Sequence, residues 1–144
     1  MRFNFLTLTD KKYSIDSSKY KIDWNARNVS KFQFDVKSFF KTYWQKDYCC
    51  EEFPCIVKLT DSKLRFDIIN LTRKIVVEAN HDQHFKYNKF FHGKKEDFLD
   101  KQLVSDRKKE LWCEKNKYTL IEIYPSNMPI KLNELLTKYG NICY

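Results

Sequence analysis

The amino-acid sequence predicts a domain of the α+β class. Apolar residues recur at helical spacing in one early segment, and short runs rich in β-branched and aromatic residues separate it from a second, long helical segment. The chain has 144 residues, which fits one ordinary domain, and its hydrophobic fraction of 42% excludes a disordered chain. We therefore expect a single domain over residues 1–144, with an N-terminal extension at 1–28, a core at 30–124 and a C-terminal helix at 130–140.

The first expected elements are short strands and then a helix. Residues 1–28 mix aromatic and polar side chains, so we expect one or two short strands and a loop there. Ser30-Lys31-Phe32-Gln33 is a capping box, in which the serine hydroxyl and the glutamine side chain satisfy free amides at the start of a helix. Apolar residues then recur every three or four positions, which predicts a helix from Ser30 to about Lys46. We expect Pro54 to end the loop that follows.

Strand-like runs come next, and the last two of them predict a hairpin. The three runs are Cys55–Leu59, Leu64–Leu71 and Lys74–Asn80. Only Thr72 and Arg73 separate the second run from the third, which is the spacing of a tight turn. The remaining expected elements, in chain order, are a long polar helix at about 95–116, a strand at 118–124 and a short helix at 130–139.

The predicted hairpin brings two carboxylates together. If Leu71 pairs with Lys74, Asp67 and Glu78 become direct cross-strand neighbours, with Cβ atoms about 4.5–5.5 Å apart. Two like charges on otherwise apolar strands require neutralisation. A divalent cation is one solution, because Mg²⁺ takes hard oxygen ligands. The alternative is that a nearby lysine or arginine, Arg65 included, holds each carboxylate.

A polar and titratable segment follows Glu78 at the end of a buried strand. Residues 78–85 read Glu-Ala-Asn-His-Asp-Gln-His-Phe, and such clusters are typical of functional sites. A zinc site is the rival interpretation. However, His81 and His84 lack a cysteine pair at finger spacing, and the adjacent Cys49 and Cys50 are poorly spaced for chelation.

Taken in chain order, the motifs at Asp67, at residues 78–85 and at residues 106–109 resemble a phage-encoded branch of the PD-(D/E)XK nuclease superfamily, akin to very-short-patch-repair and homing-type endonucleases. The resemblance is carried by Asp67 on a strand, by Glu-x-x-x-x-Gln-His-Phe at 78–85 and by Asp-x-x-Lys at 106–109 on the next helix. It covers roughly residues 24–124. It implies a restriction-endonuclease-like αβββαβ core, with a mixed central sheet flanked by helices.

The resemblance also implies a Mg²⁺-dependent endodeoxyribonuclease, with Mn²⁺ as a substitute. Asp67 and Glu78 would be the metal ligands. Asn80, opposite Arg65 in the predicted register, would orient the attacking water, and His84 would act as general base or contact the phosphate. The superfamily usually has lysine where Asn80 stands, and no Pro-Asp pair precedes the second core strand. These departures leave open a non-cleaving nucleic-acid-binding protein on a degenerate nuclease fold.

Charge also favours nucleic acid as the partner. The formal net charge is +8, and nucleic acid is the simplest anionic partner of a basic protein; the alternative on charge alone is a soluble basic protein that binds no acidic partner. Lys109 would reach a phosphate if its side of the long helix faces the sheet, with Asp106 and Gln83 in support; otherwise Asp106 and Lys109 form an ordinary surface pair. The residues expected to contact DNA are Arg65, Arg73, Lys86, Lys89, Arg107 and Lys108.

The sequence further indicates where the protein acts. No apolar run approaches the roughly 18 residues of a membrane span, and the N-terminus does not resemble a signal peptide. The five cysteines are an odd number, which favours reduced thiols. We therefore expect a cytoplasmic protein without a membrane partner, in a phage-infected host cell if the resemblance holds. Nicking by a monomer and paired cutting by a homodimer both remain open.

Overall fold

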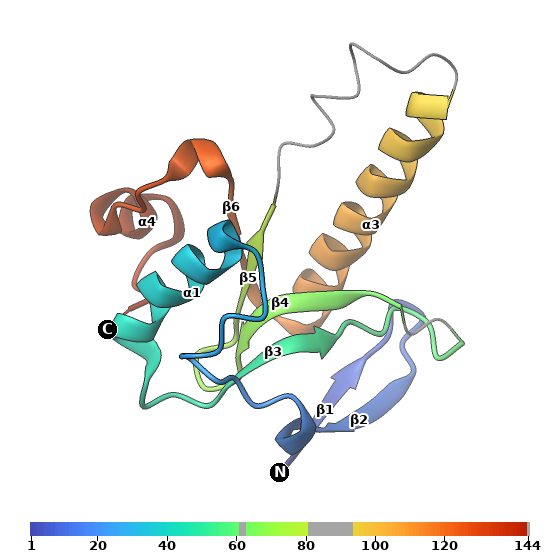
Figure 1. Cartoon of the computed structure of the whole chain (residues 1–144). Helices are drawn as coiled ribbons and strands as arrows, with labels where there is room; N and C mark the ends of the chain where they lie inside the picture. The colour runs from blue at the N-terminus through green and yellow to red at the C-terminus, as the bar shows by residue number, and fades with distance from the viewer. Residues whose placement is uncertain (61–62, 81–93, 144) are drawn as a thin grey trace.

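A computed structural model describes residues 1–60, 63–80 and 94–143, and of residues 94–104 it describes only the backbone. Short 3-10 helices lie at Ser17–Lys19 and Pro125–Asn127. The other elements, in chain order, are β1 (Arg2–Leu6), β2 (Lys12–Asp16), α1 (Lys31–Trp44), β3 (Cys49–Pro54), β4 (Arg65–Asn70), β5 (Ile75–Ala79), α3 (Lys94–Asn116), β6 (Thr119–Ile123) and α4 (Leu132–Tyr139) (Figure 1).

The central sheet has the strand order β3-β4-β5-β6. Strand β4 is antiparallel to β3 and to β5, whereas β6 runs parallel to β5. Helices α1 and α4 cover one face of this sheet, while α3 and the β1-β2 hairpin cover the other (Figure 1). The predicted α+β class, with a mixed sheet flanked by helices, is therefore confirmed.

The capping box at the start of α1 forms as predicted. Ser30 Oγ accepts a hydrogen bond from the Gln33 backbone N–H at 3.2 Å, and Gln33 Oε1 accepts one from the Ser30 backbone N–H at 3.3 Å. These reciprocal bonds satisfy amides that the first helical turn leaves without partners. They fix where α1 begins and, with it, the position of Gln33.

The first core strand differs from the prediction. We expected a strand at Cys55–Leu59 and a loop ending at Pro54, but the strand is Cys49–Pro54, and Pro54 is its last residue. Glu52 has a positive φ of 49°, and the burial of side chains along β3 does not alternate. A period-two pattern is the main sequence signal of a strand, so this irregular strand gives little sign of itself.

Trp112 of α3 is the centre of the apolar cluster on the α3 face. Its ring lies 5.2 Å from that of Phe5 and 5.0 Å from that of Phe66, measured between centroids, and its Nε1 donates to Tyr13 Oη at 2.7 Å. Trp112 thereby joins α3 to both the N-terminal hairpin and the central sheet. On the opposite face, Val36, Phe40 and Trp44 of α1 pack against the same sheet.

All five cysteines are free and buried. Cys49 belongs to the apolar cluster on the α1 face and Cys50 to the cluster on the α3 face. Adjacent strand residues point to opposite sides of a sheet, so these two thiols are not arranged to bind one metal ion together. None of the helices in the described part of the chain is long and apolar enough to cross a membrane.

We expect Trp112→Ala to lower the free energy of unfolding by about 3–5 kcal/mol, because it removes a fully buried aromatic side chain and leaves a cavity. Urea denaturation measures the change. The exposed Glu114 on the same helix provides the control, and Glu114→Ala should alter stability by no more than about 0.5 kcal/mol. A loss below about 1 kcal/mol for Trp112→Ala would contradict the central role of this residue.

Candidate active site

The predicted register of the β4-β5 hairpin is confirmed, with Ile68 facing Val77. One residue further along each strand, Asp67 and Glu78 are the next pair in this register. At this position side-chain carboxylates, rather than backbone carbonyls, accept the hydrogen bonds between the strands. The Asp67 backbone N–H donates to Glu78 Oε2 at 2.9 Å, and the Ala79 N–H donates to Asp67 Oδ2 at 2.8 Å. At the open end of the hairpin, each carboxylate therefore accepts a hydrogen bond from the backbone of the opposite strand.

Lys109 of α3 neutralises one of these carboxylates. Glu78 is only 3% exposed, and its Oε1 forms an ion pair with Lys109 Nζ. Cys113, one turn further along α3, is buried as well, so this stripe of the helix faces the sheet rather than solvent. Of the two ways of neutralising the acid pair that the sequence left open, a metal ion or a basic side chain, the structure shows a basic side chain at Glu78.

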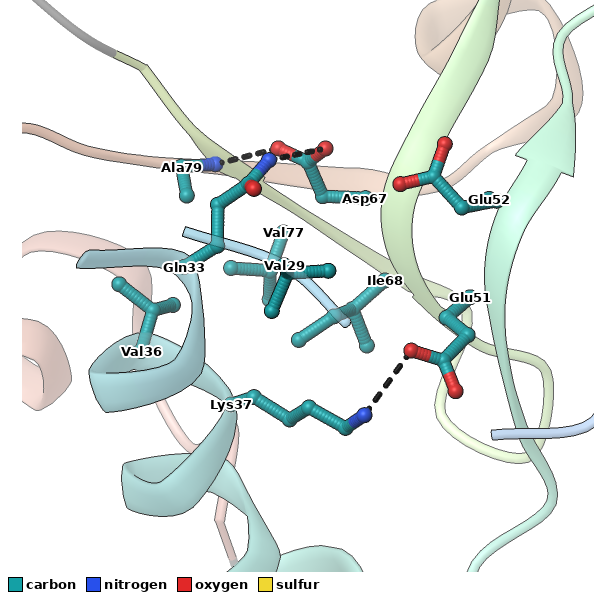
Figure 2. Close-up of a pocket in the computed structure, with 10 residues that line it drawn as sticks. All are labelled: Val29, Gln33, Val36, Lys37, Glu51, Glu52, Asp67, Ile68, Val77 and Ala79. Carbon is teal, nitrogen blue, oxygen red and sulfur yellow. Dashed lines mark hydrogen bonds and ion pairs between the residues drawn. The ribbon is translucent and has the colours of Figure 1, made fainter. Parts of the chain in front are cut away.

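Asp67 has different neighbours. Its Oδ1 accepts a hydrogen bond from Gln33 Nε2 of α1 at 3.3 Å, and the carboxylate of Glu52 on β3 points toward it from the other side (Figure 2). These side chains line a cavity between α1 and the sheet. The same cavity contains the buried Lys37, whose Nζ lies 2.9 Å from Glu51 Oε1.

The site holds more negative than positive charge near Asp67. Burial and then the charge of Asp67 raise the pKa of Glu78 to about 8, against the opposing effect of Lys109. Burial, Asp67 and Glu51 also raise the pKa of Glu52. Burial acts to lower the pKa of Lys109, but the charge of Glu78 and its hydrogen bond outweigh this and raise it. An added cation would relieve the repulsion among the carboxylates.

A second polar cluster lies beside the first. The side-chain amide of Asn80 donates to Glu122 Oε2 at 3.1 Å, and Tyr124 Oη donates to the same oxygen at 3.1 Å. Burial is the largest cause of a raised pKa at Tyr124, and the charge of Asp106 contributes to it. The charge of Asp106 on α3 thus acts on this second cluster.

The expected placement of Asn80 opposite Arg65 lies beyond the paired part of the β4-β5 hairpin. The antiparallel β4-β5 ladder ends at the pair Ile68 and Val77, but the parallel β5-β6 ladder continues to Ala79. The Asn80 backbone N–H accordingly donates to Ile123 O at 2.8 Å, and its side chain bonds to Glu122. Asn80 is therefore bonded to β6 through both its backbone and its side chain.

The other predicted site residues are dispersed. Arg73 lies at the turn, the opposite end of the hairpin from the acid pair, where its Nε is 2.6 Å from Asp47 Oδ2. Arg65 is the first residue of β4. Arg107 is exposed on α3 and forms an ion pair with Glu110, and Lys108 follows Arg107 in the sequence. Four further predicted residues, Gln83, His84, Lys86 and Lys89, lie outside the described residues.

Sequence reasoning did not assign four polar residues of these two clusters to the site, namely Gln33, Glu52, Glu122 and Tyr124. Gln33 was explained by the capping box, so nothing in the sequence indicated a second contact for it. Glu52 preceded the expected first strand. For Glu122, its place on the strand after the long helix was a usable signal, because β5 and β6 are neighbours and Glu122 pairs with Glu78 in the register.

The donor set suits a hard divalent cation. Within the described ranges, no three His, Cys, Asp or Glu side chains form a group that could hold a metal ion by themselves. Mg²⁺, however, commonly binds one or two carboxylates and keeps several waters. Asp67 and Glu78 each accept a hydrogen bond on both oxygens, and a carboxylate has about four lone-pair sites, so capacity for a cation remains.

Comparisons with known proteins assign no function. No family model matches the chain, and no solved structure matches it. Uncharacterized protein 033L of Invertebrate iridescent virus 3 is 35% identical over 65 residues, which is 45% of this chain. The match covers 33% of that viral protein, so the chain spans a minor part of the length of this relative. Its name states no activity.

The raised pKa of Glu78 predicts how stability depends on pH. Folding raises this pKa from 4.5 to about 8, so between these values the folded protein binds a proton that the unfolded chain has released. The stabilisation is complete below the lower value and is lost as pH rises through the upper one. In EDTA, we therefore expect Glu78→Gln to gain stability relative to wild type between about pH 5 and pH 8, by at most about 1.4 kcal/mol per pH unit.

Urea denaturation of both proteins at several pH values measures this difference. Asp35→Asn is a control, because Asp35 pairs with Lys31 on the exposed side of α1. A stability difference between Glu78→Gln and wild type that does not change with pH would contradict the raised pKa.

Proposed function

We propose that the protein is a metal-dependent endodeoxyribonuclease with a restriction-endonuclease-like core. The juxtaposition of Asp67, Glu78 and Lys109 at the open end of one hairpin carries the proposal. The element order α1, β3, β4, β5, α3, β6 supports it, because this is the αβββαβ order that the sequence resemblance implies. The parallel pairing of β5 with β6 is consistent with the mixed sheet expected of such a core.

Hydrolysis of a phosphodiester requires three things of a site. The charge on the scissile phosphate must be offset, a water must become nucleophilic, and the leaving oxygen must be stabilised. Asp67 and Glu78 are the residues that would hold Mg²⁺ or Mn²⁺. When bound, this ion supplies charge stabilisation and lowers the pKa of its water.

The remaining tasks fall to side chains of the chain itself. The ammonium group of Lys109 stands beside Glu78 and is available to contact a phosphate at the acid pair. Asn80 carries an amide that orients a water but cannot take its proton. His84 is therefore the proposed general base, since the unperturbed pKa of histidine, about 6.5, suits that role.

A second candidate function is nucleic-acid binding without cleavage on a degenerate nuclease fold. Two observations favour it: Asn80 replaces the usual lysine, and Lys109 already neutralises Glu78. Incubation with supercoiled, branched and mismatched DNA, in Mg²⁺ and in EDTA, separates the two functions. Cleavage in Mg²⁺ alone supports the nuclease, whereas DNA binding without any cleavage supports the alternative.

We expect Asp67→Ala and Glu78→Ala to abolish cleavage while leaving DNA affinity largely intact, because metal ligands serve the chemistry more than the docking of DNA. Gel-shift titration and a nicking assay measure the two properties separately. Asp35, which is partly exposed and pairs with Lys31, again provides a control, and Asp35→Asn should retain both DNA binding and cleavage. Parallel loss of binding and cleavage, or retained cleavage, would show that this acid pair does not hold the metal.

The roles of His84 and Asn80 predict effects of different size. His84→Ala should slow cleavage by about 10²–10⁴-fold, as expected for loss of a general base. Asn80→Ala should cost less, up to about 10²–10³-fold, because one positioned hydrogen bond is lost. The wild-type rate should also fall as pH drops below about 6.5. A flat pH profile that His84→Ala does not change would place the general base elsewhere.

A further inference from the structure

Gln33 contacts both the cap of α1 and the candidate active site. Its Oε1 accepts hydrogen bonds from the backbone N–H and the Oγ of Ser30, each at 3.3 Å. Its Nε2 donates to Asp67 Oδ1, also at 3.3 Å, and Figure 2 shows the side chain reaching from α1 toward Asp67. One amide group thus links the start of a helix to a proposed metal ligand.

The cap determines which end of this amide faces Asp67. The backbone N–H of Ser30 can only donate, so the amide oxygen of Gln33 must turn toward it. The amide nitrogen is then directed at Asp67, whose ionised carboxylate can only accept. The capping box therefore orients Gln33 as a donor to the site in addition to starting the helix.

Asp67 is held from two directions. Oδ1 bonds to Gln33 of α1, and Oδ2 bonds to the backbone N–H of Ala79 on β5 at 2.8 Å. Gln33 is the residue through which α1 donates to this carboxylate. Donors on both oxygens fix the rotation of the carboxylate, and partners of this kind tune the affinity of a ligand for its metal.

We infer that Gln33 is a positioning residue for Asp67, which it holds in the orientation that binds the metal. The inference rests on the proposed function, because it concerns one of the proposed metal ligands. It assigns Gln33 no contact with the substrate or with the reacting atoms. Its effect is transmitted entirely through the carboxylate of Asp67.

Two substitutions separate this role from helix capping. Gln33→Met keeps the length of the side chain but removes both the capping bond and the donor to Asp67. Ser30→Ala weakens the cap while the Ser30 position keeps its backbone N–H, so the amide of Gln33 retains its orientation. Both variants should lower the melting temperature by a few degrees, as expected for a damaged N-cap.

Titration calorimetry with Mn²⁺ alone then tests the inference. We expect the dissociation constant to rise about tenfold or more in Gln33→Met, within the range of about 10–100-fold seen for partners of metal ligands, and to stay near the wild-type value in Ser30→Ala. Raising the Mg²⁺ concentration should restore cleavage by Gln33→Met but not by Asp67→Ala.

The possible failures are distinguishable. Absence of Mn²⁺ binding by the wild-type protein would overturn the metal site of the proposed function, and the inference with it, before any variant is compared. If the wild type binds Mn²⁺ and the two variants bind it equally well, Gln33 does not position Asp67, although the proposed metal site stands.

Discussion

The burial of Glu78 at the end of β5 is the constraint on which the arrangement around the candidate site depends. A carboxylate that is 3% exposed is costly unless other groups compensate for its lost hydration. Lys109 of α3 and the backbone N–H of Asp67 supply that compensation. Helix α3 must therefore cross the sheet in one register, and the fully buried Trp112 and Cys113 hold it there. Packing and charge select the same position of the helix.

The acidic cluster of Asp67, Glu52 and Glu78 lowers the stability of the fold. Burial and then the charge of Asp67 raise the pKa values of Glu52 and Glu78, and the charge of Lys109 opposes this effect at both residues. Side chains also replace backbone hydrogen bonds at the open end of the hairpin, where a purely structural hairpin would continue its ladder. Natural proteins tolerate such arrangements mainly at sites with a function.

The sequence predicted well what local patterns determine. The two-residue gap between strand-like runs was enough to predict that Asp67 and Glu78 are cross-strand neighbours. Contacts between distant elements were not accessible in this way. The irregular backbone at Glu52 removes the alternating pattern by which strand β3 could have been predicted. The hydrogen bonds of Asn80 depend on where the β4-β5 ladder ends and how far the β5-β6 ladder continues, which the sequence does not show. Gln33 was recognised for its local bond alone.

The reactivity of the buried cysteine thiols reports local unfolding of the protein. Burial is the largest cause of a raised pKa at every one of the five cysteines, which keeps them in the unreactive protonated form. Cys49 and Cys50 are consecutive, yet they belong to the apolar clusters on opposite faces of the sheet. Alkylation of each thiol requires local unfolding on its own face of the sheet. Peptide mapping of the two modifications therefore distinguishes fluctuations on the α1 face from those on the opposite face, where Cys50 Sγ lies against the backbone of Ser17.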